Sequence, residues 1–181
     1  MKHLLRALIL AVLIPVAPAL AQGVASADGR FVALFDDDGR TLVVQDAASG
    51  EEIHRRALTA RDGSPQTAAG AIAVPDRQSV LIALAGAAEL WEVALFEDAG
   101  PFHQGFVHSY IVGMEESLEF EVGLFARQRI FLSQPVTALA LHPTDRLSVL
   151  AWRADGSAVR IQLAVRREIE TFAPGELPLA D

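Results

Sequence analysis

The sequence contains no cysteine. The chain therefore forms no disulfide bond, offers no thiolate nucleophile and cannot attach a c-type haem through a pair of cysteines. It also lacks the serine elbow of hydrolases, the Walker phosphate-binding loop and the glycine pattern of dinucleotide-binding folds. Hydrolase, nucleotidase and dehydrogenase activities are therefore without support in the sequence.

The N-terminal segment reads as a secretory signal. Residues 1–21 have a basic start, an apolar run at Ala7–Val16 and a small-residue pattern at Ala19–Ala21. A membrane-anchoring helix is the alternative, but Pro15 and Pro18 interrupt the apolar stretch, which is shorter than the roughly 20 residues that span a bilayer. We expect cleavage after residue 21, a periplasmic location and no membrane insertion of the mature chain.

Lysine and positive charge are scarce in the expected mature chain. The only lysine in the sequence, Lys2, lies in the segment that is expected to be cleaved. The mature chain would then have no lysine to serve as a nucleophile or to form a Schiff base. The remaining 13 arginines face 23 acidic residues, which gives a net charge near −10. An acidic surface repels phosphate backbones, and we expect no nucleic-acid partner.

Three segments of the chain repeat one another. Each has an aspartate followed by a short apolar run, and a second apolar run starts thirteen residues after that aspartate. The aspartates are Asp28, Asp76 and Asp145, and the second runs start at Thr41, Glu89 and Ala158. A further apolar piece precedes each aspartate. The carboxylate of an aspartate stabilises a turn by accepting hydrogen bonds from nearby backbone amides, so these aspartates are interpreted as structural.

Short strands at regular spacing with Asp-Gly turns predict antiparallel meanders. A repeat of about 35 to 50 residues with four strands is typical of a propeller blade. We therefore predict an all-β fold in residues 22–181, built of four-stranded antiparallel meander blades that form a partial β-propeller of about three blades. A β-sandwich with similar turns is the alternative.

The second repeat is longer than the first. The aspartates lie 48 and then 69 residues apart, so about 21 extra residues fall in the second copy, within an insertion at about 97–134. The stretch Glu89–Gly113 overlaps this insertion and contains two histidines, the only tyrosine and a tryptophan. Long loops in compact domains are uncommon unless they bind something or move.

The insertion supplies the candidate binding residues. His103 and His108 are five residues apart, which suits neither a helical metal pair nor one face of a strand, and we expect no metal site. His108 and Tyr110 would share one face of a strand. An imidazole there could ligate haem iron or donate a proton, or it could be a half-buried histidine bonded to backbone.

Arg127 and Arg129 also share a strand face. Their planar guanidinium groups could bind the carboxylates of a tetrapyrrole, or they could pair with the acidic run Glu115–Glu121. Trp91 and Trp152 are interpreted as core residues of blade strands. Two further histidines are not assigned to a site, since His54 is expected on a solvated face among charged residues and His142 in a turn between strands.

The chain resembles the cytochrome d1 family, which includes dissimilatory nitrite reductase and d1-haem maturation proteins, over roughly Ala69 to Phe172. The matching residues are Leu90, Trp91, Glu92 and Val93, then Val107, His108 and Tyr110, then Arg127 and Arg129. Ser109 stands where the family tends to have aspartate. The resemblance implies haem d1 as the ligand, with His108, Tyr110, Arg127 and Arg129 as its binding residues, and a role in denitrification. Family members have about eight blades, however, and neither the haem-iron ligand nor the catalytic histidine pair can be placed here.

Two functions follow as hypotheses. The first is an exported non-catalytic module that binds a partner protein or a haem-like ligand in denitrification or respiratory maturation. The second is a d1-haem carrier or maturation enzyme that uses His108, Tyr110, Arg127 and Arg129. Because an unclosed arc of blades leaves sheet faces uncovered, we also expect a protein partner or a homo-oligomer.

Overall fold

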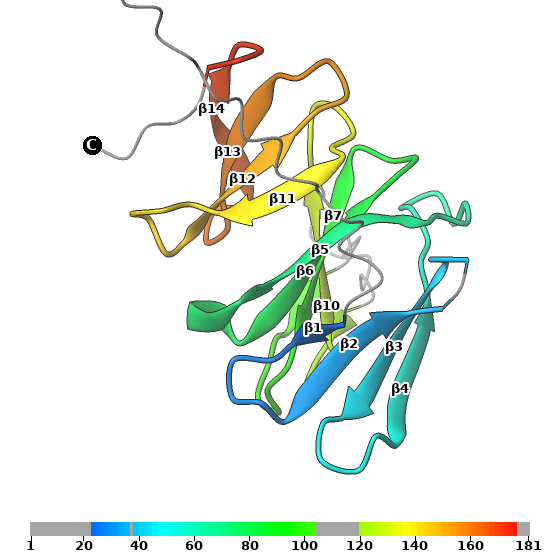
Figure 1. Cartoon of the computed structure of the whole chain (residues 1–181). Helices are drawn as coiled ribbons and strands as arrows, with labels where there is room; N and C mark the ends of the chain where they lie inside the picture. Colours follow the sequence, from blue (N-terminus) through cyan, green and yellow to red (C-terminus); the bar gives the residue numbers. More distant parts are fainter. Residues whose placement is uncertain (1–22, 37, 104–119, 177–181) are drawn as a thin grey trace, which may run out of the picture.

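The computed structural model describes residues 23–36, 38–103 and 120–176. These residues form three four-stranded antiparallel sheets, a two-stranded hairpin and one turn of 3-10 helix at Pro75–Arg77 (Figure 1). In this part of the chain no helix is both long and apolar enough to cross a bilayer. The predicted all-β class and the four-stranded meanders are confirmed. The expected signal segment lies outside the described residues.

Each four-stranded sheet is one blade. Blade 1 consists of β1 Val24–Ala25, β2 Phe31–Phe35, β3 Thr41–Asp46 and β4 Glu52–Ala57. Blade 2 consists of β5 Ala68–Val74, β6 Ser79–Leu84, β7 Glu89–Ala94 and β10 Arg127–Phe131. Blade 3 consists of β11 Ala138–Leu141, β12 Ser148–Trp152, β13 Ala158–Gln162 and β14 Arg167–Phe172. The third strand of every blade begins at the residue that the thirteen-residue spacing predicts.

The repeated aspartates occupy the turn between the first and second strands of each blade. Asp28 accepts a hydrogen bond from the backbone N–H of Arg30 over 3.1 Å, and Asp145 accepts one from Leu147 over 3.0 Å. Both bonds reach two residues along the chain, as expected for an aspartate that stabilises a turn. Asp76 lies in the equivalent turn, which here is the 3-10 helix, and its carboxylate faces an arginine of blade 3 instead.

The core lies between the blades, because the two faces of blade 2 are both covered. Along β6, Ile82 points toward blade 1 and Leu81 toward blade 3, and both side chains are fully buried. This alternation follows from the two-residue period of a strand. The innermost strands also adjoin, since β5 contacts β1 on one side and β11 on the other. Apolar packing therefore joins blade 2 to blade 1 and to blade 3. The three blades follow one another in sequence order (Figure 1).

A hairpin separates the third and fourth strands of blade 2. It pairs β8 Phe102–His103 with β9 Phe120–Glu121 and contacts β10. Phe96 and Phe102 pack there against a small cluster of alanines at the end of blade 2, namely Ala94, Ala99 and Ala126. The hairpin thus lies at the end of blade 2 where β7 stops and β10 starts.

Candidate functional site

Two of the four predicted ligand residues can be placed. His108 and Tyr110 lie outside the described residues. Arg127 and Arg129 lie on β10, two residues apart, and both guanidinium groups face the ring of Trp91 on the neighbouring strand β7. Their Cζ atoms are 4.5 and 5.3 Å from the centroid of the indole ring, within the range of a cation–π contact. Trp91 is fully buried, as expected for a core residue.

Arg127 is paired with Glu121 of the hairpin. Its Nη2 donates to Oε1 of Glu121 over 2.7 Å, and its backbone N–H donates to Oε2 over 2.8 Å. Burial, followed by the positive charge of Arg129, lowers the pKa of Arg127. The intramolecular pairing with the acidic run is therefore confirmed for this arginine and for Glu121.

Arg129 pairs with a different carboxylate. Its Nη1 donates to Glu89 and also to the backbone carbonyl of Thr59, which is 3.0 Å away. Glu89 further accepts hydrogen bonds from Nε1 of Trp91 over 3.2 Å and from the backbone N–H of Arg61 over 3.1 Å. Thr59 and Arg61 belong to the connection between blade 1 and blade 2. The Arg129–Glu89 pair therefore holds that connection against the outer strand of blade 2.

A second contact between the blades involves His54, and it corrects the sequence interpretation. His54 does not lie on a solvated face: it is half-buried, and its ring stacks on Phe125 with centroids 4.7 Å apart. The reason is strand alternation, which turns His54 and Arg56 of β4 toward blade 2. Arg56 donates to Glu121 over 2.5 Å. Burial, and then the charge of Arg56, lowers the pKa of His54, and its Nε2 is buried without a hydrogen-bond partner in the described structure.

The other histidines have simple surroundings. His142 forms a turn, as expected, because its Nδ1 accepts backbone hydrogen bonds from Thr144 over 3.3 Å and from Asp145 over 3.0 Å. His103 is exposed on β8 and contacts the edge of Phe120. The described ranges contain no group of three or more histidine, aspartate or glutamate side chains placed to bind a metal ion.

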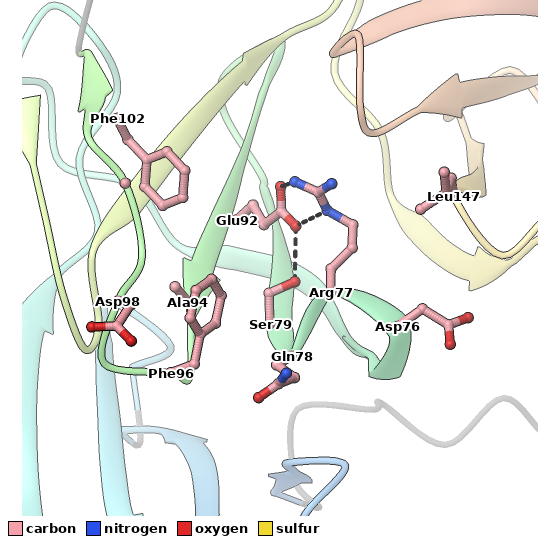
Figure 2. Close-up of a pocket in the computed structure, with 11 residues that line it drawn as sticks. Asp76, Arg77, Gln78, Ser79, Glu92, Ala94, Phe96, Asp98, Phe102 and Leu147 are labelled. Carbon is pink, nitrogen blue, oxygen red and sulfur yellow. Dashed lines mark hydrogen bonds and ion pairs between the residues drawn. The ribbon is translucent and has the colours of Figure 1, made fainter.

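The structure also contains a groove that the sequence did not indicate. It has a volume of about 420 Å³ and lies where the turns of blades 2 and 3 meet the segment after β7 (Figure 2). Residues of the β5–β6 turn form one side, Ala94, Phe96, Asp98 and Phe102 form another, and Leu147 of the β11–β12 turn reaches in from blade 3. No sequence signal links these segments, since they meet only after folding.

An ion pair forms the wall of this groove. Arg77 binds Glu92 through two parallel hydrogen bonds, with Nε donating to Oε1 over 2.5 Å and Nη2 donating to Oε2 over 2.9 Å. The hydroxyl of Ser79 donates to the same carboxylate over 2.8 Å (Figure 2). Both oxygens of Glu92 are therefore occupied and its charge is compensated. This arrangement suits a fixed binding surface more than proton transfer.

Sequence reasoning missed the partners Glu89 and Glu92, although a signal was present. Both carboxylates stand in the strand Glu89–Ala94, whose other residues are apolar and in which every residue is buried. A buried carboxylate is costly unless it is paired and hydrogen-bonded. Two acidic residues in a core strand therefore predict two cations nearby, and these are Arg129 and Arg77.

Comparison with known proteins establishes the fold. No protein-family model and no curated protein matches the chain. Among solved structures, a dihydro-heme d1 dehydrogenase NirN in complex with DHE is similar with a TM-score of 0.62 and 19% identity, over 82% of this chain and 27% of that one. Hydrazine synthase from Kuenenia stuttgartiensis is similar with a TM-score of 0.54 and 10% identity, over 94% of this chain and 40% of that one.

A third similar structure is explicitly a propeller. The Cps50 (Swd1) β-propeller domain of Myceliophteria thermophila has a TM-score of 0.51 and 15% identity, over 86% of this chain and 43% of that one. The chain thus spans less than half the length of each of these three structures. At these identities the likeness concerns the fold alone, and the chain folds as three blades of a partial β-propeller.

Proposed function

We propose that this chain is an exported, non-catalytic β-propeller module that works by binding another protein chain. The observation that carries the proposal is the engagement of Arg127 and Arg129, the two described ligand candidates, in ion pairs of the protein itself. The Arg129–Glu89 pair is almost fully buried, with 9% and 4% of the two side chains exposed. These groups stabilise the contact between blades. Export is supported by the signal pattern of residues 1–21.

The outer faces of blades 1 and 3 are the surfaces proposed for binding. On blade 1, Val32 and Leu34 alternate with Ala33, which faces blade 2, so they lie on the opposite face with Ile53. Ile53 is 41% exposed. On blade 3, Trp152 and Phe172 cover Leu150 on the face turned away from blade 2. Within the described residues no further blade covers either face.

A second copy of the chain is the proposed occupant, with the outer face of blade 3 packed on the outer face of blade 1. Closed symmetric homo-oligomers are the common solution for such surfaces, and two copies would supply six blades, within the four to eight that close a propeller. On blade 3, Val149 and Ala151 take no part in this contact, because they are fully buried against blade 2.

Light scattering on the purified mature protein tests this proposal. We expect the mass of two chains at micromolar concentration, and a shift to one chain in Ile53→Arg. Val165→Arg is the matched control, since Val165 is similarly exposed, at 57%, in the turn after β13. A single-chain mass for the unaltered protein, with no partner recovered from cell extract, would reject association through the blade faces.

A d1-haem carrier or maturation enzyme is the second candidate. It is favoured by the likeness in fold to NirN, which was solved in complex with DHE, together with the family resemblance that includes His108 and Tyr110. On this hypothesis, haem d1 added to the purified protein gives a shifted absorption band that weakens in His108→Ala. A spectrum that does not change, or one that is indifferent to this substitution, removes the second candidate.

A further inference from the structure

The groove beside blade 2 is separate from the outer faces of blades 1 and 3. It opens at the end of the blades where the β5–β6 and β11–β12 turns lie, together with the segment that leaves β7. Its volume of about 420 Å³ falls in the range of ligand pockets, roughly 300 to 1,000 Å³. A ligand could therefore occupy it whether or not the blade faces are covered.

Apolar side chains from two different blades line the groove, among them Phe96 and Leu147. Phe96 is held in place by the alanine cluster at the end of blade 2. Leu147 stands in the β11–β12 turn of blade 3 and is 40% exposed. Removing the surface of an apolar side chain from water is favourable by about 25 cal/mol per Å². Together they offer a partner apolar contact from two sides.

The uncompensated charge of the groove is negative. The inner pair Arg77–Glu92 is neutral, whereas Asp76 and Asp98 are exposed and lie on opposite sides of it (Figure 2). Asp98 makes no hydrogen bond or ion pair with the residues that the structure describes. Asp76 forms an ion pair with Arg146 over 3.5 Å, and the side chain of Arg146 is 84% exposed. Such an exposed pair contributes little and is easily exchanged for another partner.

The groove also offers a hydrogen-bonding group for a backbone. Gln78 closes the β5–β6 turn with a positive φ of 47°, and its own main-chain groups are engaged with Pro75 and Leu95. Its exposed side-chain amide has no partner in the described part of the chain, although it lines the groove. An amide can donate and accept one hydrogen bond each with a peptide unit.

From these features we infer that the groove binds a polypeptide segment of a partner protein in which a basic residue stands beside a bulky apolar one. The cation would lie against Asp98 or Asp76, the apolar side chain against Phe96 and Leu147, and the peptide backbone against Gln78. A basic side chain fits such a surface because its aliphatic stem packs on apolar groups while its charge stays at the rim. The inference goes beyond association through the blade faces and does not depend on it.

A labelled peptide tests the inference by fluorescence anisotropy. The probe is Gly-Leu-Arg-Phe-Gly, blocked at both ends, titrated with the mature protein at low salt. We expect saturable binding that weakens at least threefold when glutamate replaces the arginine of the peptide, and similarly when glycine replaces both of its apolar residues. Equal binding of all three peptides, or no binding of the first, would overturn the inference.

Protein variants locate the site. Asp98→Asn removes one charge without removing any hydrogen bond of the described structure, and it should weaken binding of the arginine peptide about three- to fivefold. Glu97→Gln is the matched control, because it removes the same charge from the preceding residue, which is exposed and does not line the groove. Equal losses in the two variants would mean that only the overall charge matters, which would reject the groove as the site.

Two further measurements separate the alternatives. Blocked arginine amide, tested as a competitor, should displace the peptide far more weakly than the unlabelled peptide does. Equal displacement would replace the polypeptide with a small organic cation as the occupant and overturn the inference as stated. The variant Ile53→Arg should leave peptide binding unchanged, so that failure of blade-face association and failure of this site give different results.

Discussion

Glu89 links the connection between blades 1 and 2 to the outer strand of blade 2. Its carboxylate is 4% exposed and accepts hydrogen bonds from Arg129, from the indole of Trp91 and from the backbone of Arg61. A buried cation that loses its partner is left uncompensated, which costs about 3 to 5 kcal/mol. We expect Glu89→Ala to reduce the free energy of unfolding by about that amount in urea denaturation.

A surface pair provides the control for Glu89→Ala. Glu52 binds Arg55 through two hydrogen bonds, but about half of each side chain is exposed. Pairs of this kind contribute roughly 0 to 1 kcal/mol. Glu52→Ala should therefore change the free energy of unfolding by less than about 1 kcal/mol. Similar losses in the two variants would contradict the structural role assigned to Glu89.

His54 makes the contact between blades sensitive to pH. Burial against Phe125 lowers the pKa of its imidazole below the ordinary value of about 6.5. The unfolded chain then binds a proton at a higher pH than the folded chain does. Stability therefore rises with pH in the window between the lowered pKa and about 6.5, and it falls as the solution is acidified through this window.

Replacing His54 tests this pH dependence. In His54→Leu the free energy of unfolding should change less between pH 7.5 and pH 5.5 than in the unaltered protein, because the titrating group is gone. His103→Leu is the control, since His103 is exposed. A pH dependence that survives in His54→Leu would assign it to other groups.

At the scale of single elements, the turns before the second strands differ although their aspartates repeat. Asp145 accepts hydrogen bonds from the Ser148 hydroxyl over 2.5 Å and from Arg160 over 2.6 Å, and these bonds lower its pKa to about 2. Asp76, in the equivalent turn of blade 2, makes only the contact of 3.5 Å with Arg146 among the residues that the structure describes.

Asp145→Ala should therefore lower the Tm more than Asp76→Ala does, as measured by circular dichroism. The pH dependence has the same sense as that of His54, because the pKa of each group is lower in the folded chain than in the unfolded chain. Because the folded pKa of Asp145 is depressed, its contribution is present above the ordinary value of about 3.8 and is lost as the pH falls toward about 2. Equal losses of Tm in the two variants would show that the aspartates stabilise these turns in the same way.

The sequence predicts the strands of this molecule better than the contacts between them. The third strands start at Thr41, Glu89 and Ala158 because each repeat has the same turn length after its aspartate. The partners of Glu89 could not be placed in this way, since Arg61 lies in the connection between blades 1 and 2 and Arg129 lies in another strand. The prediction for His54 is wrong for the same reason. Its neighbours in sequence are charged, which predicts a solvated face, but alternation in β4 turns its ring toward Phe125.

The groove marks another limit of sequence reasoning. Asp76 and Leu147 belong to equivalent turns of different blades, and they meet only because blades 2 and 3 pack side by side. Repeat detection identifies that these turns are equivalent. It carries no information on which side chains of two such turns line a common surface, because that depends on how one blade is rotated against the next.

At the scale of the whole molecule, blade 2 couples the other two blades. Both faces of its central strands are buried, with one apolar cluster shared with blade 1 and another shared with blade 3. In repeat architectures, stability is approximately the sum of the stability of each unit and of the contacts between neighbours. Loss of blade 2 would expose both clusters at once, so the three blades should unfold together.

The two tryptophans allow this cooperativity to be measured, because Trp91 lies in blade 2 and Trp152 in blade 3. In Trp152→Phe the remaining indole reports on blade 2, while far-ultraviolet circular dichroism reports on all three blades. We expect the two signals to give the same midpoint in urea.

Two core variants test the packing on each side of blade 2. Leu81→Ala opens a cavity toward blade 3, and Ile82→Ala opens one toward blade 1. Each should lower the single urea midpoint and reduce the free energy of unfolding by about 2 to 5 kcal/mol. Separate transitions in either variant would mean that the blades fold independently and that packing between them contributes little.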